Sequence, residues 1–298
     1  MIMFKNLKKF QFNYEVGKKT WFGSGGNALI FSQINQVNSI CNLLKFIPQK
    51  IPIFILGAGS NILVRDGGFN GLVIKLGKNF KKISYNKSSQ IIEIGSASKD
   101  SEIAKYCLEN SIKGFEYLKG IPGTLGGNLV MNAGCYGHTI SDLLISCKII
   151  SRDGSIQELK KELIHFSYRR SSIPKDSIII SAKFFAKRGN KINIKNKMKQ
   201  ISRSRFTSQP TNSRTGGSTF KNPPNESAWS LIDKINYRGK KRGGAMVSTQ
   251  HANFMINESA ASSLDIETLG EEIKEKVKKE FKINLDWELE RIGNFKKL

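Results

Sequence analysis

Two glycine-rich stretches of this 298-residue sequence are suited to holding a phosphate-bearing ligand. Residues 57–61 read Gly-Ala-Gly-Ser-Asn between two short apolar runs, which predicts a strand, a tight glycine turn and a second strand. Residues 120–137 contain six glycines and one proline, and because glycine has no Cβ, a ligand or another backbone can approach closely. The N–H groups of Gly126 and Gly127 could bind an anion there. The alternative is a plain glycine-rich loop of a β-rich protein, since short glycine motifs have many false positives.

The first stretch differs from the common dinucleotide-binding pattern. That pattern needs G-x-G-x-x-G at the opening of a helix, whereas here β-branched apolar residues follow Asn61 at once. The sequence therefore predicts that another fold binds a nucleotide-type ligand.

Three further segments carry side chains that could act on such a ligand. Arg169 and Arg170 are adjacent and cannot both face one site, so one could hold an anion while the other is solvated; a plain charged loop fits equally well. Ser218 stands on a glycine turn before two prolines, and no histidine is near it in the sequence, so an ordinary turn serine fits better than a hydrolase nucleophile. Glu288 and Glu290 lie in a strand-like segment that turns both to one face, where either could be a solvated edge charge.

Taken together, these segments resemble a known family. The runs Gly57-Ala-Gly-Ser-Asn-Ile-Leu-Val-Arg-Asp66 and Gly120-Ile-Pro-Gly-Thr-Leu-Gly-Gly127 are similar to UDP-N-acetylenolpyruvoylglucosamine reductase, the MurB flavoenzyme of peptidoglycan precursor synthesis. The resemblance covers nearly the whole chain. It implies UDP-N-acetylmuramate dehydrogenase activity: reduction of UDP-N-acetyl-3-O-(1-carboxyvinyl)-glucosamine to UDP-N-acetylmuramate, with FAD as cofactor and NADPH as co-substrate.

The motifs of that family assign catalytic roles to three residues. Its Tyr-Arg-x-Ser motif places the catalytic arginine at Arg169, and its Gly-Ser-x-Phe-Lys-Asn-Pro motif places a proton-donating serine at Ser218. Its C-terminal motif, Leu-x-x-Glu-Val-Arg-x-x-Gly, selects Glu288. The segment Leu289-Glu290-Arg291 moves the expected arginine by one place, so the choice between Glu288 and Glu290 stays open.

The resemblance also implies two sets of binding residues. The residues expected to bind FAD are Gly57, Ala58, Gly59, Ser60, Asn61, Gly120, Ile121, Pro122, Gly123, Thr124, Gly127, Asn132, Ala133 and Gly134. The residues expected near the substrate are Tyr168, Lys221, Asn222, His251 and Asn253. FAD should be noncovalent, because residues 57–61 contain no histidine of the kind that tethers it in flavin oxidases of the same broad fold. The short spacing from Arg170 to Ile178 is typical of the family type that lacks a tyrosine-bearing insertion.

The fold class implied for these residues is α+β. It consists of an FAD-binding fold of the vanillyl-alcohol-oxidase (PCMH) type in two subdomains, followed by a C-terminal α+β substrate domain. The expected boundaries are 1–79 for the first subdomain, 80–205 for the second and 206–285 for the substrate domain, with 286–298 returning to the first subdomain.

Local patterns predict the elements that position the site. We expect helices capped by Ser32 and by Asp100, and a cap at Thr124. We also expect hairpins over 81–95 and 144–159, a buried strand over 178–185, helices over 192–206, 228–235 and 269–281, and a strand over 285–293.

Composition limits the remaining function classes. The formal charge of +24 invites a nucleic-acid-binding hypothesis, but the lysines are spread from Lys5 to Lys297 without a basic cluster, so only a general attraction for anionic nucleotides follows. Four cysteines without paired spacing and three histidines predict reduced thiols and no metal site. Residues 1–12 lack the apolar region of a signal peptide, and no apolar run approaches the ~18 residues of a membrane helix.

We therefore expect a cytoplasmic monomer that binds neither nucleic acid nor membrane. The nearest rival is an FAD-dependent oxidase of an alcohol or hydroxy acid, which would need a base to take a substrate proton. The set of serine, arginine and glutamate fits protonation of a carbanion better.

Overall fold

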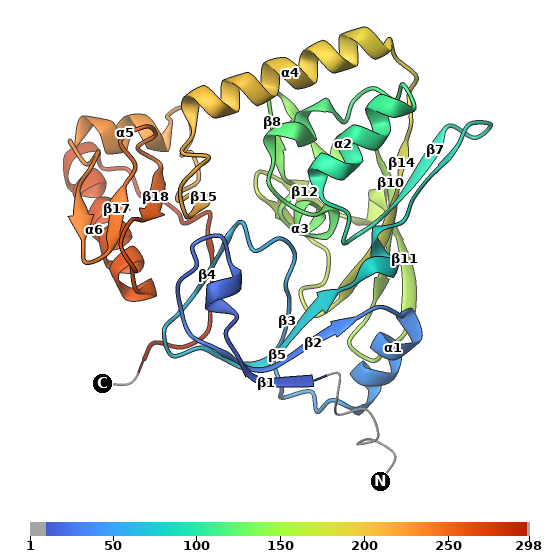
Figure 1. Ribbon diagram of the computed structural model, residues 1–298, viewed down its shortest axis with the longest axis horizontal. Coiled ribbons are helices and arrows are strands. Elements are labelled where there is room, and N and C mark those ends of the chain that lie inside the picture. The colour runs from blue at the N-terminus through green and yellow to red at the C-terminus, as the bar shows by residue number, and fades with distance from the viewer. Residues whose placement is uncertain (1–9, 297–298) are drawn as a thin grey trace. The chain divides into compact units, whose positions relative to one another are not determined.

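The computed structural model describes residues 10–296, and its elements are drawn in Figure 1. The strands are β1 (Phe10–Tyr14), β2 (Ala28–Ile34), β3 (Ile53–Ile55), β4 (Ile62–Val64), β5 (Phe69–Leu76), β6 (Ile83–Asn86), β7 (Ile91–Gly95), β8 (Gly134–Cys135), β9 (His138–Thr139), β10 (Leu144–Ile150), β11 (Ile156–Lys160), β12 (Phe166–Ser167), β13 (Arg170–Ser171), β14 (Ile178–Phe185), β15 (Thr215–Ser218), β16 (Lys241–Arg242), β17 (Ala245–Val247), β18 (Phe254–Asn257) and β19 (Glu290–Ile292). The α-helices are α1 (Val37–Phe46), α2 (Asp100–Glu109), α3 (Leu125–Met131), α4 (Lys191–Ser208), α5 (Ala228–Lys234) and α6 (Ser263–Phe281). Short 3-10 helices are η2 (Gly17–Lys19), η3 (Lys78–Lys81), η4 (Glu116–Gly120), η5 (Ile140–Asp142) and η6 (Lys161–Leu163).

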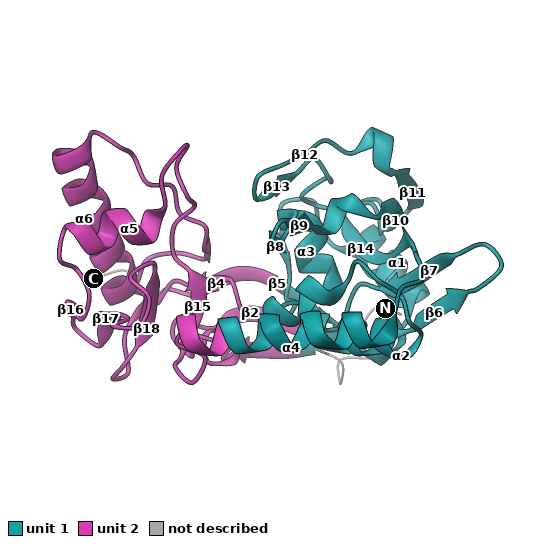
Figure 2. Ribbon diagram, turned by 90° about the horizontal axis from the view of Figure 1, so that it is seen from above, with its two compact units in different colours: residues 1–10, 32–58, 73–204 teal, residues 11–31, 59–72, 205–298 magenta. Residues whose placement is uncertain are grey.

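The described chain divides into two compact units, coloured separately in Figure 2. Unit 1 contains residue 10 and residues 32–58 and 73–204, and unit 2 contains residues 11–31, 59–72 and 205–296. The division differs from the predicted three-part scheme, which stays a prediction.

Unit 1 is built on a five-stranded antiparallel sheet with strand order β11-β10-β14-β7-β6. The two predicted hairpins, β6–β7 and β10–β11, and the predicted strand β14 are all present. The apolar core of the unit joins sheet residues such as Ile94 and Phe184 to Ile103 of α2 and Leu125 of α3. This core fixes α3, which begins inside the glycine-rich stretch.

Unit 2 contains a four-stranded sheet with the order β15-β18-β17-β16 and the predicted helices α5 and α6. Leu269, Ile273 and Val277 of α6 are buried at the four-residue spacing expected of an amphipathic helix. Strand β19 pairs in parallel with β4, so the C-terminal segment lies beside the strand that follows residues 57–61. A further sheet, with the order β1-β2-β5-β3, contains three strands, β1, β2 and β5, in which the chain passes between the units.

Two predicted helix caps are wrong. Ser32 lies inside β2 and is 1% exposed, and α1 begins only at Val37, after Gln36. The apolar residues before Val37 fit a buried strand as well as a helix, which is why the pattern misled. At α2 the cap position is Lys99, whose N–H donates to the carboxylate of Glu102 (3.0 Å), and the Asp100 carboxyl turns into the core instead.

Two further expectations hold in part. Thr124 occupies the cap position of α3, but its hydroxyl makes no capping hydrogen bond. The predicted strand over 285–293 is reduced to β19, because the Glu288 N–H donates to Thr219 O (2.8 Å) and the Glu290 N–H donates to Asn61 O (3.0 Å). The chain thus changes partners between these two residues.

Within residues 10–296, no helix is long and apolar enough to cross a membrane. The same part of the chain contains no group of three or more histidine, cysteine or acidic side chains placed to hold a metal ion. The prediction about residues 1–12 falls mostly on residues outside the described range.

Candidate active site

The glycine-rich stretch of unit 1 is packed mainly against the protein itself. A Cβ on Gly123 would lie 2.7 Å from Asp100 Oδ2, a Cβ on Gly126 would lie 3.3 Å from Ser96, and a Cβ on Gly134 would lie 2.3 Å from His138 O. At Gly127 the nearest atom would be Thr124 Oγ1, 3.8 Å away. The room that the sequence suggested for a ligand is therefore already filled at three of these glycines and open at Gly127.

The N–H groups follow the same division. The Gly126 N–H donates to Ser96 O (2.9 Å), which corrects the expectation that it is offered to an anion. Among the described residues, the Gly127 N–H donates no main-chain hydrogen bond outside the helices and strands. Gly127 thus combines open space with an available donor, and Gly57 lies near it because a Cβ on Gly57 would come 2.7 Å from Thr124 Oγ1.

Residues 96–100, called the floor segment below, are hydrogen-bonded along one side of this stretch. Backbone bonds join Ser98 O to the Leu125 N–H (3.1 Å) and Gly123 O to the Asp100 N–H (3.2 Å). Four buried polar atoms around the stretch have no hydrogen-bond partner in the structure: Ser96 Oγ, Ser98 Oγ, Asp100 Oδ2 and Asn132 Oδ1. Buried polar groups are nearly always paired, so such a cluster fits a polar ligand that supplies the missing donors and acceptors.

Asp100 is the most perturbed group of the floor segment. It is fully buried, and its Oδ1 accepts a hydrogen bond from Asn128 Nδ2 (2.6 Å). Burial raises the pKa of the Asp100 carboxyl to about 8, against smaller opposing contributions from the bonds with Asn128 and Gly123. The carboxyl is therefore neutral at pH 7.

The Tyr168-Arg169 pair forms the tip of the β12–β13 hairpin in unit 1. Arg169 has a positive φ of 55° and is half-buried with its guanidinium 5.0 Å from the Tyr168 ring centre, whereas Arg170 is exposed. Asn132 Nδ2 donates to Ser167 O (3.1 Å), which ties the hairpin to the glycine-rich stretch. The hairpin thus holds Arg169 beside the predicted cofactor residues of the same unit.

Ser218 ends strand β15 in unit 2, after a break in the pairing with β18. The register shifts between Thr215 and Ser218, and Gly217 adopts a positive φ of 82°. Such irregularities re-aim a side chain out of the regular alternation of a strand. Ser218 is half-buried, and no group in the described residues forms a hydrogen bond with its hydroxyl.

Glu288 lies beside Ser218 through main-chain contacts. Its N–H donates to the carbonyl of Thr219 (2.8 Å), and its own carbonyl accepts from Asn61 Nδ2 (3.0 Å). Glu288 is half-buried, whereas Glu290 is exposed. Asn61 of the first glycine stretch, Ser218 and Glu288 therefore lie together in unit 2.

The residues expected near the substrate have mixed surroundings. The amide of Asn253 is 3% exposed and both its ends bind Phe220: Nδ2 donates to the carbonyl (2.8 Å) and Oδ1 accepts from the N–H (2.9 Å). These bonds position the segment after Ser218, and a contact with the substrate stays a prediction. Asn222 Oδ1 accepts from the Ala228 N–H (3.0 Å) at the start of α5.

His251 Nδ1 accepts a hydrogen bond from the Asn253 N–H (3.2 Å). Burial, and to a smaller extent the charge of Arg238, lower the pKa of His251 below its usual value, so the ring is neutral at pH 7. Lys221 binds the carbonyl of Asp286 (2.8 Å) through its N–H.

Comparison with known proteins identifies the protein family of this chain. Residues 209–292 match the model of the UDP-N-acetylenolpyruvoylglucosamine reductase C-terminal domain, and residues 29–160 match that of an FAD binding domain. UDP-N-acetylenolpyruvoylglucosamine reductase of Rickettsia prowazekii is 41% identical over 287 residues, which cover 96% of this chain and 97% of that protein. The chain belongs to the UDP-N-acetylenolpyruvoylglucosamine reductase (MurB) family.

Further members of the MurB family show the same similarity in sequence and in structure. The Rickettsia massiliae reductase is 42% identical over 285 residues, covering 96% of each chain. The crystal structure of MurB from Thermus caldophilus superposes with a TM-score of 0.82 at 28% identity, covering 96% of this chain and 98% of that one. The predicted family and fold class are confirmed: the chain is an oxidoreductase with FAD as its cofactor, on an α+β FAD-binding fold with a C-terminal domain.

The residues of this MurB chain fit that cofactor. Gly127 offers an open approach, and the four unpartnered buried polar atoms surround the same stretch. Sequence reasoning missed Ser96 and Ser98 as candidate site residues. The available signal was the spacing of Ser96, Ser98 and Asp100 at the entry to a predicted helix, because polar residues at every second position of an extended segment share one side.

Proposed function

We propose that the chain reduces UDP-N-acetyl-3-O-(1-carboxyvinyl)-glucosamine to UDP-N-acetylmuramate with NADPH as the electron source. The observation that carries this proposal is the link from Asn61 through Glu288 to Thr219, which gathers a predicted cofactor residue and two predicted catalytic residues in unit 2. This arrangement supports a reaction in which a carbanion-like carbon is protonated next to the cofactor.

FAD, held without a covalent bond, would be bound by residues 57–61, by 120–124, by Gly127 and by 132–134. Once bound, the flavin would supply the hydride chemistry that links oxidation of NADPH to reduction of the enolpyruvyl β-carbon. The open face of Gly127 and its N–H support contact at this residue.

Arg169 would stabilise the negative charge that develops on the α-carbon and carboxylate of the substrate. A fixed donor aimed at developing charge in a water-poor site lowers the barrier by roughly 3 to 4 kcal/mol. The half-buried Arg169, on a hairpin that Asn132 ties to the glycine-rich stretch, supports this role.

Ser218 would donate its hydroxyl proton to the α-carbon. A serine hydroxyl is a weak acid, so the step requires a strongly basic carbon and a short distance. The unshared hydroxyl and the re-aimed strand end support it. Glu288 would orient the substrate or a water molecule that returns a proton to Ser218, and its half-buried position favours it over the exposed Glu290.

The proposal extends to the substrate-binding domain, the oligomeric state and the cellular location of the protein. Residues 206–285 would bind the UDP-sugar, with Lys221 and Asn222 near it, and the enzyme would act as a monomer in the cytoplasm during cell-wall synthesis. The pairing of β19 with β4 supports the return of the C-terminal segment to the first FAD-binding subdomain.

Ser218→Ala tests the proton-transfer step directly. We expect the variant to bind FAD and to be reduced by NADPH at the wild-type rate, and to lose the reoxidation of its flavin by the enolpyruvyl substrate. Anaerobic stopped-flow absorbance separates these two half-reactions. Ser213→Ala, an exposed residue of the same segment, is the matched control. Wild-type reoxidation in Ser218→Ala would remove this serine from the mechanism.

A further inference from the structure

A buried carboxylate on α6 joins the two strands that lead to the proposed catalytic residues. Glu267 is 4% exposed and accepts three hydrogen bonds from arginines. Arg65 donates to it from Nε (2.9 Å) and Nη2 (3.0 Å), and Arg291 donates from Nη1 (3.1 Å). A two-point arginine–carboxylate contact fixes direction as well as distance.

The two arginines belong to the paired strands β4 and β19. Arg65 follows β4 directly and its N–H donates to Ile292 O (2.9 Å), while Arg291 lies within β19 opposite Leu63. Asn61, just before β4, exchanges hydrogen bonds with Glu288, two residues before β19, and with Glu290, its first residue. Glu267 therefore binds one arginine from each of the two segments, within a few residues of Asn61 and Glu288.

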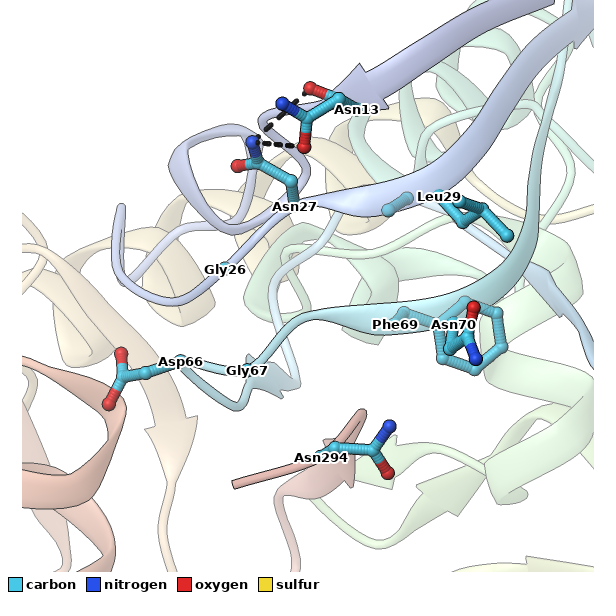
Figure 3. A pocket seen from close by; sticks show the side chains of 10 residues that line it. Asn13, Gly26, Asn27, Leu29, Asp66, Gly67, Phe69, Asn70 and Asn294 are labelled. Atoms are coloured by element: carbon cyan, nitrogen blue, oxygen red, sulfur yellow. Dashed lines mark hydrogen bonds between the residues drawn. The ribbon is translucent and has the colours of Figure 1, made fainter. Parts of the chain in front are cut away.

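The neighbour of Arg65 makes a second attachment to the same helix. The two oxygens of Asp66 accept from the N–H groups of Ser263 and Leu264 (3.0 Å each), at the first turn of α6. Asp66 is one of the residues that line a surface pocket of about 550 Å³. Figure 3 shows its carboxylate turned away from Asn27 and Asn13. That pocket contains none of the predicted site residues.

Glu288 has a further restraint through the residue before it. Trp287 Nε1 donates to Glu271 Oε1 (2.7 Å), and the Arg291 guanidinium lies 4.5 Å from the Trp287 ring centre. Arg291 also reaches Glu271 (3.4 Å). The network of Arg65, Glu267, Arg291 and Glu271 thus connects α6 to both sides of Glu288.

We propose that Glu267 is a positioning residue for the reaction: by holding β4 and β19 in register through Arg65 and Arg291, it fixes Asn61 and hence Glu288 beside Ser218. This inference rests on the proposed roles of Ser218 and Glu288. A buried ion pair that loses one partner leaves an uncompensated charge, so the arginines must move when the carboxylate is removed. A small displacement of reacting groups slows the chemistry more than it weakens binding.

Glu267→Gln is the test, measured in the FAD-loaded enzyme. We expect reoxidation of the reduced flavin at saturating enolpyruvyl substrate to slow by about tenfold or more. Reduction by NADPH, measured at saturating FAD, should stay within about twofold of wild type. Glu272→Gln is the matched control, because Glu272 lies on the same helix and pairs with Arg242 of β16. It should leave both half-reactions unchanged.

Three outcomes overturn the inference. Glu267→Gln could reoxidise at the wild-type limiting rate, with only its thermal stability reduced. It could raise only the substrate concentration needed for half-maximal rate. It could slow both half-reactions equally. Slow reoxidation in Ser218→Ala together with normal reoxidation in Glu267→Gln would refute this inference and leave the proposed function standing. A wild-type enzyme whose reduced flavin is not reoxidised by the enolpyruvyl substrate would refute the proposed function.

A second variant keeps the test decisive where Glu267→Gln does not fold. Arg291→Lys keeps the charge but loses the planar guanidinium that reaches both Glu267 and Glu271. It should show the same selective slowing of reoxidation with a smaller loss of stability. A folded Arg291→Lys enzyme with wild-type reoxidation would overturn the proposal.

Discussion

Asp100→Asn should change the way in which stability depends on pH. Asp100 is fully buried, it contacts Gly123 and Asn128, and its Oδ2 is one of the unpartnered buried atoms. Asparagine has nearly the same shape and can still accept from Asn128 through its carbonyl oxygen. The substitution therefore removes the titration while keeping the packing.

The sign follows from the raised pKa. The ordinary carboxyl titrates at 3.8 and the folded one at about 8. Between these values the folded chain binds a proton that the unfolded chain has lost, so the free energy of unfolding falls as pH rises through this window. The slope is up to about 1.4 kcal/mol per pH unit, and the full window gives an upper bound of about 6 kcal/mol. Asparagine does not titrate, so its variant lacks this loss.

Urea unfolding of wild type and Asp100→Asn at pH 5, 6, 7 and 8 measures the effect. Taking the difference between the two proteins at each pH cancels the contribution of every other titrating group. We expect the difference to move in favour of asparagine by about 1 kcal/mol per unit across this range. Parallel stability curves would refute the reasoning, because they would mean that Asp100 is ionised in the folded protein.

Two further substitutions test how the site is built. Gly127→Ala should leave the apoprotein at least as stable as wild type, because alanine favours a helix by up to about 1 kcal/mol and the new Cβ would be 3.8 Å from Thr124 Oγ1. Titration with FAD should show the Kd raised by about tenfold. An unchanged Kd would mean that the cofactor does not approach this face. Asn253→Ala should lower the free energy of unfolding by roughly 2 to 5 kcal/mol, since two buried main-chain groups of Phe220 lose their partners. Urea unfolding checks this loss, and a stable variant with weakened substrate binding alone would favour direct substrate contact.

Segments with a clear local period were predictable from the sequence. The hairpins β6–β7 and β10–β11 have turn residues between alternating strands, and α6 repeats its apolar residues every four positions. In these segments the local pattern and the tertiary packing agree, so neither had to override the other. The helix cap predicted at Ser32 was wrong for the opposite reason, because the neighbouring residues fit both a strand period and a helix period.

The candidate site was predictable in its residue types and not in its contacts. The sequence marks residues 120–137 as short of side chains, but only the fold reveals that Asp100 fills the space at Gly123 while Gly127 stays open. Likewise, Asn253 and Phe220 are 33 residues apart, so no local pattern could assign that amide to the backbone beside Ser218. Pairings between distant segments are set by packing, which a local reading does not contain.

The most direct test of the account is an anaerobic visible spectrum of the purified protein, recorded before and after two additions. We predict a flavin spectrum that NADPH bleaches and that returns only on addition of the enolpyruvyl UDP-N-acetylglucosamine substrate. A protein that stays bleached after the substrate is added, or whose colour returns equally well without it, would contradict the proposed reaction.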